Sequence, residues 1–251
     1  MAKAETFYPG LHEKDAQYSA GDYHVPALVN SRAFRRWMDA HNGKPLRILD
    51  VGCGKGRFVR DMLIEVRKRW NVPEVIANGT DLVRSPNNFF GEISPKFTFV
   101  QQNLDDQPLQ FPNNHVDFLC CNQVLEHIFE TEKLLREFKR VLAPDGLCVI
   151  SVPNTSTWIN RFTFLFGGQM LGSELGTEEI TYGFWPEFLQ PKLKQFKPSG
   201  HIRDFTPRGL RDLAAHCGFE TVGWWKQSFG LIARLSNWSG RGLGIVLQPK
   251  R

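Results

Sequence analysis

The sequence has no apolar run of transmembrane length, and its opening segment, Met1 to Gly21, is polar and unlike a secretory signal. It also lacks a C-x-x-C spacing among its five cysteines, which excludes the common patterns of a zinc site or a redox motif. No internal repeat or low-complexity segment is present. We therefore expect a cytoplasmic protein in a reducing compartment, whose cysteines are small buried apolar side chains.

The chain also has little excess charge, with a formal net charge of +5 over 251 residues. Such an excess permits an anionic partner but does not require one. The basic residues fall in short, scattered groups, as is typical of solvated helix faces, so the sequence disfavours nucleic acid as a partner. The length and the ordinary apolar content suit one α/β domain with an elaboration.

Glycine is concentrated in one informative segment, Ile48–Phe58, with the sequence I-L-D-V-G-C-G-K-G-R-F. Two apolar residues and Asp50 lead into three glycines on alternate positions, which predicts a buried strand that ends in a tight turn. Glycine allows a ligand to approach the backbone of such a turn, and the helix that follows directs its first N–H groups toward that ligand. The spacing G-x-G-x-G differs from the G-x-G-x-x-G of dinucleotide-binding turns. A strand–helix turn without a ligand is the alternative.

Alternating strand and helix patterns predict a doubly wound, mainly parallel sheet. Apolar runs bounded by turn residues mark the strands, and apolar residues at helical spacing mark the helices. The predicted strands are Leu46–Val51, Glu74–Gly79, Phe97–Gln101, His115–Asn122, Leu147–Val152, Phe219–Trp225 and Gly244–Gln248. The predicted helices are Pro26–His41, Arg57–Trp70, Thr131–Leu142 and Thr206–Gly218.

The same patterns divide the chain into four regions: a lead-in and helix (1–45), a Rossmann-like core (46–153), an insertion (154–200) and a C-terminal part of the core sheet (201–251). The insertion is rich in aromatic residues and is interrupted by glycine and proline. Connections of this length are usually lids or binding loops. We expect a substrate lid, and a small satellite core of aromatic side chains is the alternative.

Further motifs follow the glycine run in a fixed order. They are P-L-Q-F-P-N-N-H-V-D-F at 108–118, V-L-E-H-I at 124–128, V-L-A-P-D-G-L at 141–147 and S-V-P-N at 151–154. In order and spacing they resemble class I S-adenosylmethionine (SAM)-dependent methyltransferases, especially the methyltransferase type 11 and ubiquinone-biosynthesis O-methyltransferase-like members. The resemblance covers about 46–154, with a second patch at 201–219. It implies a Rossmann-like, doubly wound, mainly parallel seven-stranded sheet with an antiparallel last strand and an aromatic-rich lid insertion.

The resemblance implies SAM as the cofactor and S-adenosyl-L-homocysteine as its product. Asp81, at the end of the second strand, would accept two hydrogen bonds from the ribose diol. Asn103 takes the place of an acid that binds the adenine amino group, and Leu104 would lie against the ring. Asp105 is the alternative acid if the register is shifted. The predicted cofactor-binding residues are Asp50, Gly52, Cys53, Gly54, Gly56, Asp81, Leu82, Asn103, Leu104, Asn122 and Gln123.

Two histidines are the candidate catalytic residues. His127 follows the fourth strand at the edge where ligands bind in open α/β sheets, and a histidine can take the proton from a hydroxyl, phenol or amine acceptor. His201, just after the insertion, is the second candidate, and a structural role is the alternative for both. Some ubiquinone-type relatives bind a divalent metal through E-x-x-E-H, but Gln123 replaces the first acid here. We therefore predict no metal, although Glu126 and His127 keep that option open.

The resemblance predicts a small-molecule acceptor that is methylated at oxygen. The candidate substrate-binding residues are Trp158, Arg161, Tyr182, Trp185 and Arg203. An RNA methyltransferase is disfavoured because no N-P-P-Y or D-P-P-Y tetrad is present to hold a flipped base. The sequence also leaves open a non-catalytic SAM-binding regulatory or scaffold protein and, less favoured, a nicotinamide dehydrogenase. Apolar residues at 158–166 give a weaker prediction of contact with a membrane surface, and the sequence indicates no oligomeric state.

Overall fold

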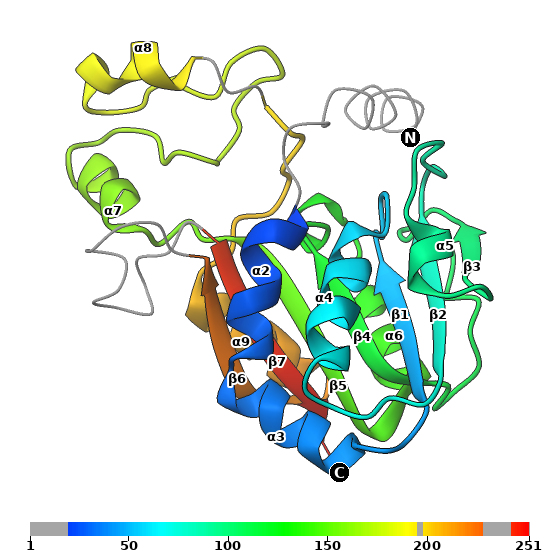
Figure 1. The fold of residues 1–251 in the computed structure, drawn as a ribbon. Helices are drawn as coiled ribbons and strands as arrows, with labels where there is room; N and C mark the ends of the chain where they lie inside the picture. The colour runs from blue at the N-terminus through cyan, green and yellow to red at the C-terminus, as the bar shows by residue number, and fades with distance from the viewer. Residues whose placement is uncertain (1–19, 195–197, 228–241, 251) are drawn as a thin grey trace.

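A seven-stranded sheet forms the centre of the computed structural model, which describes residues 20–194, 198–227 and 242–250 (Figure 1). The strands are arranged in the order β3-β2-β1-β4-β5-β7-β6. Neighbouring strands from β3 to β5 run parallel, and β7 is antiparallel to both β5 and β6, so the predicted sheet is confirmed. The strands are β1 (Leu46–Val51), β2 (Val75–Asp81), β3 (Thr98–Gln101), β4 (Val116–Asn122), β5 (Leu142–Pro153), β6 (Phe219–Gln227) and β7 (Gly242–Pro249).

The strand order reverses between β1 and β4. The chain builds β1, β2 and β3 outward in one direction and then crosses back to place β4 on the other side of β1. In doubly wound sheets, ligands bind outside the carboxyl ends of the strands at such a switch point. The ends of β1 and β4, at Val51 and Asn122, therefore mark where a ligand site is expected.

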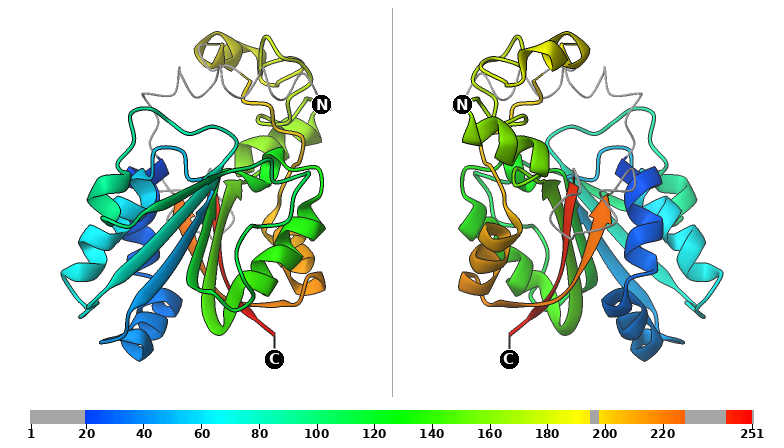
Figure 2. Two further views of the ribbon diagram at one scale, coloured as in Figure 1. Left: turned by 90° about the vertical axis from the view of Figure 1, so that its right-hand side faces the viewer. Right: turned by 90° about the vertical axis from the view of Figure 1, so that its left-hand side faces the viewer.

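Helices cover both faces of the sheet, as the edge-on views of Figure 2 show. Alternate strand residues point to opposite faces, so Ile48 packs in one core and Leu49 in the other. One core is covered by α2 (Ala20–Val29), α3 (Arg32–His41) and α4 (Arg57–Arg67), and the other by α6 (Thr131–Val141) and α9 (Pro207–His216). A short helix, α5 (Phe90–Ile93), packs on the α4 side.

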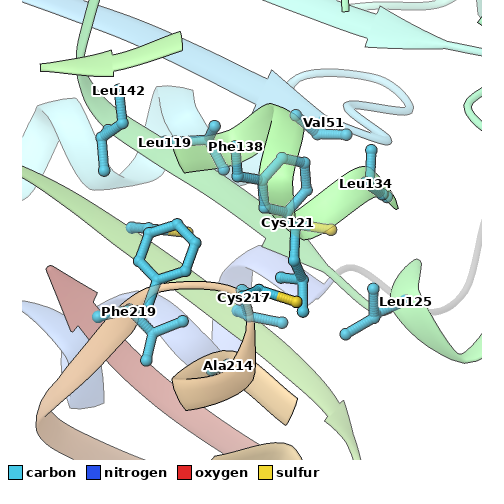
Figure 3. Close-up of a cluster of buried hydrophobic side chains, with 14 of the residues drawn as sticks. Val51, Leu119, Cys121, Leu125, Leu134, Phe138, Leu142, Ala214, Cys217 and Phe219 are labelled. Carbon is cyan, nitrogen blue, oxygen red and sulfur yellow. The ribbon is translucent and has the colours of Figure 1, made fainter. Parts of the chain in front are cut away.

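Figure 3 shows the core on the α6 and α9 side of the sheet. Phe138 from α6 and Phe219 from β6 are fully buried there, together with Cys121 and Cys217. Truncating such a phenylalanine to alanine typically costs about 3–5 kcal/mol of stability. All five cysteines are buried and carry free thiols, which confirms their predicted role as small apolar side chains.

The predicted single helix Pro26–His41 is wrong, because the chain forms two helices there. α2 ends at Val29, and α3 begins at Arg32 after Ser31. The Ser31 hydroxyl accepts a hydrogen bond from the N–H of Phe34 at 3.3 Å, which satisfies a donor at the start of α3. Serine favours this capping position over a helix interior, so the break has a local cause.

The described part of the insertion, residues 154–194 and 198–200, leaves the sheet after β5 and forms short helices joined by irregular chain. It contains α7 (Trp158–Leu165), the 3₁₀ turn η3 (Glu187–Leu189) and α8 (Gln190–Leu193). Figures 1 and 2 place α7 and α8 beyond the sheet, toward the end to which β1 points. Several large apolar side chains are exposed here: Trp158, Phe162, Phe164, Leu165, Phe166 and Phe188. Among the described helices, none combines the length and the apolar character needed to cross a bilayer.

Candidate cofactor and acceptor site

The glycine run forms the turn between β1 and α4. Gly52, Gly54 and Gly56 have φ of 73°, 49° and 76°, in the left-handed region that favours glycine. A Cβ on Gly52 would collide with the side chain of Val124. A Cβ on Gly54 would meet no described atom within 4 Å. Gly52 is therefore required for packing, whereas the Gly54 position faces open space.

Asp81, at the end of β2, is held against this turn. Its carboxylate accepts hydrogen bonds from the N–H groups of Gly54 and Leu82, both at 2.7 Å. The side chain is buried, and each oxygen of a carboxylate can accept more than one hydrogen bond. Three residues predicted to bind the cofactor thus lie together at the edge of the sheet.

Asp50, on β1, is a second buried acid near this turn. The Sγ of Cys120 donates to its Oδ1 at 3.3 Å. Burial, with a smaller contribution from the charge of Asp81, raises the pKa of Asp50 to about 7, although the Cys120 hydrogen bond opposes the shift. A cationic group beside Asp50 would favour its charged form. Cys53, inside the turn itself, is buried.

The end of β4 adds polar side chains on the other side of β1. The Ser151 hydroxyl donates to Asn122 Oδ1 at 3.0 Å, and Gln123 Nε2 donates to that hydroxyl at 3.3 Å. Within the described residues, Asn122 Nδ2 and Gln102 Oε1 are buried and have no hydrogen-bond partner. Buried polar atoms are rarely left unsatisfied in folded proteins, so both are candidates to bind a ligand.

The loop after β3 makes its own hydrogen bonds. Asn103 Oδ1 accepts from the N–H of Asp105 at 3.1 Å, and its Nδ2 donates to Asp106 at 2.7 Å. Asp105 Oδ1 accepts from the N–H groups of residues 129 and 130, just before α6. Asp105 therefore caps the entry to α6, which weakens its case as the alternative adenine-binding acid. Leu104 is buried between these polar residues.

The two candidate histidines meet although they are far apart in the sequence. His127 lies on the 3₁₀ turn η2 (Leu125–His127), and its ring centroid is 5.0 Å from that of His201. The backbone carbonyl of Glu126 accepts from the N–H groups of Ile202 and Arg203 at 2.9 and 3.1 Å. These bonds dock the chain that returns from the insertion onto the end of β4.

Glu126 lies beside this histidine pair and is completely buried. Its Oε1 is 4.0 Å from His201 Nε2, and neither carboxylate oxygen has a hydrogen-bond partner among the described residues. Burial raises the pKa of Glu126 to about 8. One ligand atom from each of Glu126, His127 and His201 lies within 4.8 Å of the others, so the three residues could hold a metal ion.

Glu174, from the insertion, is a residue that the sequence did not single out. Its carboxylate accepts from the N–H groups of Ser199, Gly200 and His201 at 2.8, 2.7 and 3.2 Å. Its Oε1 also lies 3.6 Å from His201 Nδ1. No motif marks an isolated acid of this kind in the sequence, because its role depends on three backbone groups that approach it only in the fold.

The five predicted substrate-binding residues lie in different surroundings. Arg161 stacks over Trp158 on α7, with 5.0 Å between its guanidinium carbon and the ring centroid. The Trp185 ring packs on Phe166, 4.4 Å between centroids. Tyr182 and Trp158 are among the exposed large side chains. Arg203 instead donates to the carbonyls of residues 128 and 129, at 3.4 and 2.7 Å, so it braces the loop after η2.

Comparison with known proteins agrees with this architecture. A family model described as a methyltransferase domain matches residues 21–223, and the chain belongs to this family. The protein is therefore a class I SAM-dependent methyltransferase, as the sequence motifs predict, and SAM is its cofactor.

The relatives are distant. The chain is 28% identical over 204 residues to a probable SAM-dependent methyltransferase of Mycolicibacterium smegmatis, covering 79% of this chain and 72% of that protein. It is 27% identical over 122 residues to a ubiquinone/menaquinone biosynthesis C-methyltransferase of Campylobacter jejuni, covering 47% and 49%. It is 24% identical over 112 residues to a ubiquinone biosynthesis O-methyltransferase of Vibrio atlanticus, covering 43% and 44%. The match thus spans about half the length of these last two relatives.

Solved structures show the same fold. A Burkholderia thailandensis 1,6-didemethyltoxoflavin-N1-methyltransferase, solved with S-adenosylhomocysteine bound, superposes with a TM-score of 0.53 at 18% identity, covering 94% of this chain and 93% of that one. A SAM-dependent methyltransferase of Archaeoglobus fulgidus gives 0.51 at 17% identity, covering 96% and 99%. At these identities the likeness concerns the fold alone.

Proposed function

We propose that this methyltransferase transfers the methyl group of SAM to an oxygen atom of a small-molecule acceptor, which binds beside Glu126, His127 and His201. The observation that carries this proposal is the pairing of His127 and His201 just after β4, on the loop whose Val124 packs against Gly52 of the glycine turn. Bound SAM supplies an activated methyl group on a sulfonium, a good leaving group. The protein then has to align the acceptor oxygen with that methyl group, exclude water and remove a proton.

The proposed SAM contacts follow the edge of the sheet. The open face of Gly54 and the carboxylate of Asp81 suit a ribose diol. The buried acid Asp50 suits the cationic methionine end. Two buried polar atoms without partners among the described residues, on Gln102 and Asn122, support a ligand that completes their hydrogen bonds. The remaining proposed contacts are Gly52, Cys53, Gly56, Leu82, Asn103, Leu104 and Gln123.

His127 is the proposed proton acceptor. Its Nδ1 is 3.1 Å from the carbonyl oxygen of Gly200, and because a carbonyl can only accept, Nδ1 carries the hydrogen. In the neutral ring this tautomer leaves the lone pair on Nε2. A hydroxyl or phenol of the acceptor can donate its proton there as the oxygen attacks the methyl group. A carbon acceptor is the second candidate, because one relative is named as a C-methyltransferase.

Residues 154–200 are proposed to cover the acceptor. Trp158, Arg161, Tyr182 and Trp185 would supply apolar and cationic contacts, since all four belong to the insertion, whose helices α7 and α8 lie beyond the strand ends (Figure 1). Arg203 is proposed to act by bracing the loop that follows His127. An exposed aromatic surface of this kind suits a planar or apolar acceptor better than a highly charged one.

Calorimetry with SAM, S-adenosylhomocysteine and NAD⁺ on the purified protein tests the cofactor assignment. We expect micromolar binding of the two sulfur nucleosides and none of NAD⁺. A screen of phenols and other hydroxyl compounds with SAM labelled in its methyl group then tests the acceptor. Label recovered in an ether or ester product supports transfer to oxygen, and label found only on carbon or nitrogen overturns it.

A further inference from the structure

We propose that Glu126, His127 and His201 together bind a divalent transition-metal cation beside the acceptor. This inference rests on the proposed function, because it concerns how the same cluster activates the acceptor oxygen. A cation bound there would act as a Lewis acid and lower the pKa of the acceptor hydroxyl. Two imidazoles and one carboxylate form a donor set that suits Zn²⁺, Fe²⁺ or Co²⁺ better than Mg²⁺ or Ca²⁺.

The geometry of the three side chains is close to that of a metal site. One ligand atom from each lies within 4.8 Å of the other two, and Glu126 Oε1 is 4.0 Å from His201 Nε2. Ligand bonds of about 2.1 Å place neighbouring ligand atoms about 3.0–3.4 Å apart. Since no two of the three atoms are more than 4.8 Å apart, an approach of about 1–2 Å would bring them to that separation.

The carboxylate of Glu126 gives an independent indication of a ligand. The residue is completely buried, and neither oxygen has a hydrogen-bond partner among the described residues. Burying a carboxyl group without compensation is unfavourable, and such groups are normally paired or coordinate a metal. A cation between the carboxylate and the histidines would pair the charge of Glu126 and give its carboxylate oxygens a binding partner.

The surroundings of the two imidazoles resemble the outer contacts of metal-binding histidines. His127 Nδ1 donates to the carbonyl of Gly200, and His201 Nδ1 lies 3.6 Å from the Glu174 carboxylate. The bond to Gly200 fixes the tautomer of His127, and the Glu174 carboxylate is placed to do the same for His201 if its Nε2 binds a metal. His201 Nε2 is also 2.9 Å from Ser199 Oγ, which itself donates to Glu174, so cation binding would replace the Ser199 contact.

This ligand set shares Glu126 and His127 with the E-x-x-E-H pattern considered from the sequence, and it differs at the first position of that pattern. Gln123, at the first position of that pattern, is turned toward Ser151 and bonds its hydroxyl at 3.3 Å. His201 supplies the third ligand instead, from the chain that returns from the insertion. The prediction of no metal followed from Gln123 alone, and the fold gives a reason to revise it.

Titration with Co²⁺ tests the site without relying on activity. The full-length protein is treated with a chelator, dialysed and titrated while visible absorption is recorded. We expect one equivalent of Co²⁺ to give the d–d bands of a histidine- and oxygen-bound ion. His201→Ala should weaken binding by more than about 100-fold, since ligand loss exceeds the ~10–100-fold typical of outer contacts. His216→Ala, which removes an exposed histidine at the end of α9, should leave the titration unchanged.

Glu126→Gln provides a second ligand variant. If this substitution at a buried position prevents folding, His201→Ala still tests the site, because His201 is partly exposed. Absence of the bands in the wild-type protein, or bands retained in His201→Ala, would overturn the proposed site. SAM binding measured by calorimetry on the same metal-free sample separates the two proposals. Normal SAM binding without Co²⁺ binding rejects only the cation site and returns proton removal to His127. Loss of SAM binding rejects the proposed function itself.

Discussion

The carboxylate of Glu174 accepts a hydrogen bond from the N–H of Gly200 at 2.7 Å. Gly200 in turn accepts from His127 Nδ1, so an acid in the insertion is connected through one glycine to the candidate base. Glu174 also accepts hydrogen bonds from the N–H groups of Ser199 and His201, so one carboxylate holds the backbone of residues 199–201. Both histidines are therefore connected to Glu174 of the insertion.

Glu174→Gln should lower turnover while leaving SAM affinity unchanged. The amide keeps one acceptor oxygen but places an NH₂ group against backbone donors, which loosens Gly200 and His201. Loss of charge-assisted hydrogen bonds of this type costs about 1.5–3 kcal/mol. Urea unfolding, calorimetry with SAM and steady-state kinetics measure the three quantities. Glu178→Gln, an exposed acid nearby, is the matched control, and an equal effect of both variants would contradict this role.

Asp81→Ala should weaken SAM binding by about 10-fold or more, because the bonds to the ribose diol and the support of the Gly54 amide are both lost. Asp81→Asn should have a smaller effect, since it retains one acceptor oxygen. Calorimetry on folded variants gives the affinities. Glu92→Ala, which removes an exposed acid on α5, should bind SAM normally. Unchanged affinity in Asp81→Ala would remove Asp81 from the cofactor site.

Gly54→Ala and Gly43→Ala form a matched pair. Both glycines have positive φ, and a Cβ at either position meets no described atom within 4 Å. Each substitution should therefore destabilise the fold by a similar amount, about 1–2 kcal/mol for the left-handed backbone. Only Gly54→Ala should also weaken SAM binding, because its Cβ would enter the space proposed for the cofactor. Equal SAM affinities in the two variants would mean that this space is not used.

The raised pKa of Asp50 predicts a specific pH dependence of the protein's stability. Its folded-state pKa is raised to about 7, well above the ordinary value of an aspartate, so the native protein keeps a proton that the unfolded chain loses. The resulting destabilisation is absent below about pH 4, grows as the pH rises and is complete above about pH 7. The stability of Asp50→Asn relative to wild type should therefore increase from about pH 5 to about pH 7.5. Urea unfolding of both proteins across this pH range measures the difference in stability. A difference that stays constant or falls with pH would be inconsistent with a raised pKa of Asp50.

SAM binding should respond to the same group. A cationic methionine end favours the charged form of Asp50, so binding releases a proton when the pH lies below about 7. SAM affinity should consequently rise between about pH 5.5 and about pH 7.5 in the wild-type protein and rise less in Asp50→Asn. Calorimetry in buffers of different ionisation enthalpy reports the proton directly.

His127→Ala should reduce kcat by at least about 100-fold while SAM still binds, as expected for removal of a group that takes a proton in the transition state. His115→Ala, at the opposite end of the β4 region, is the matched control and should retain turnover. If His127→Ala turns over normally at saturating acceptor, the residue has a structural role only.

The sequence predicted most of the sheet and the position of the glycine turn, because both depend on local patterns. Apolar runs define buried parallel strands, and the alternate glycines at 52, 54 and 56 all adopt the left-handed backbone that their spacing suggests. The break at Ser31 was missed because the apolar spacing continues across it, while the capping hydroxyl acts over a few residues only.

The acceptor side of the site was less predictable, because its contacts join residues distant in the chain. His127 and His201 were both proposed, but neither their meeting nor the role of Glu174 follows from spacing. The contacts of Asp105 and Arg203 could not be predicted from the sequence either. Both have side chains that could bind a ligand, and in the fold they instead bond backbone groups around residues 128–130.

The attachment of His201 has a consequence for how this enzyme can diversify. The proposed SAM contacts are fixed by β1, β2 and β4, whereas the acceptor side is positioned by bonds from Glu174 and Glu126 to the returning segment 199–203. Changes within 175–194 that preserve these two anchors can alter the shape presented to an acceptor without disturbing the cofactor. The proposed site would make acceptor choice and SAM affinity separable traits, open to independent change by exchange of that single stretch of chain.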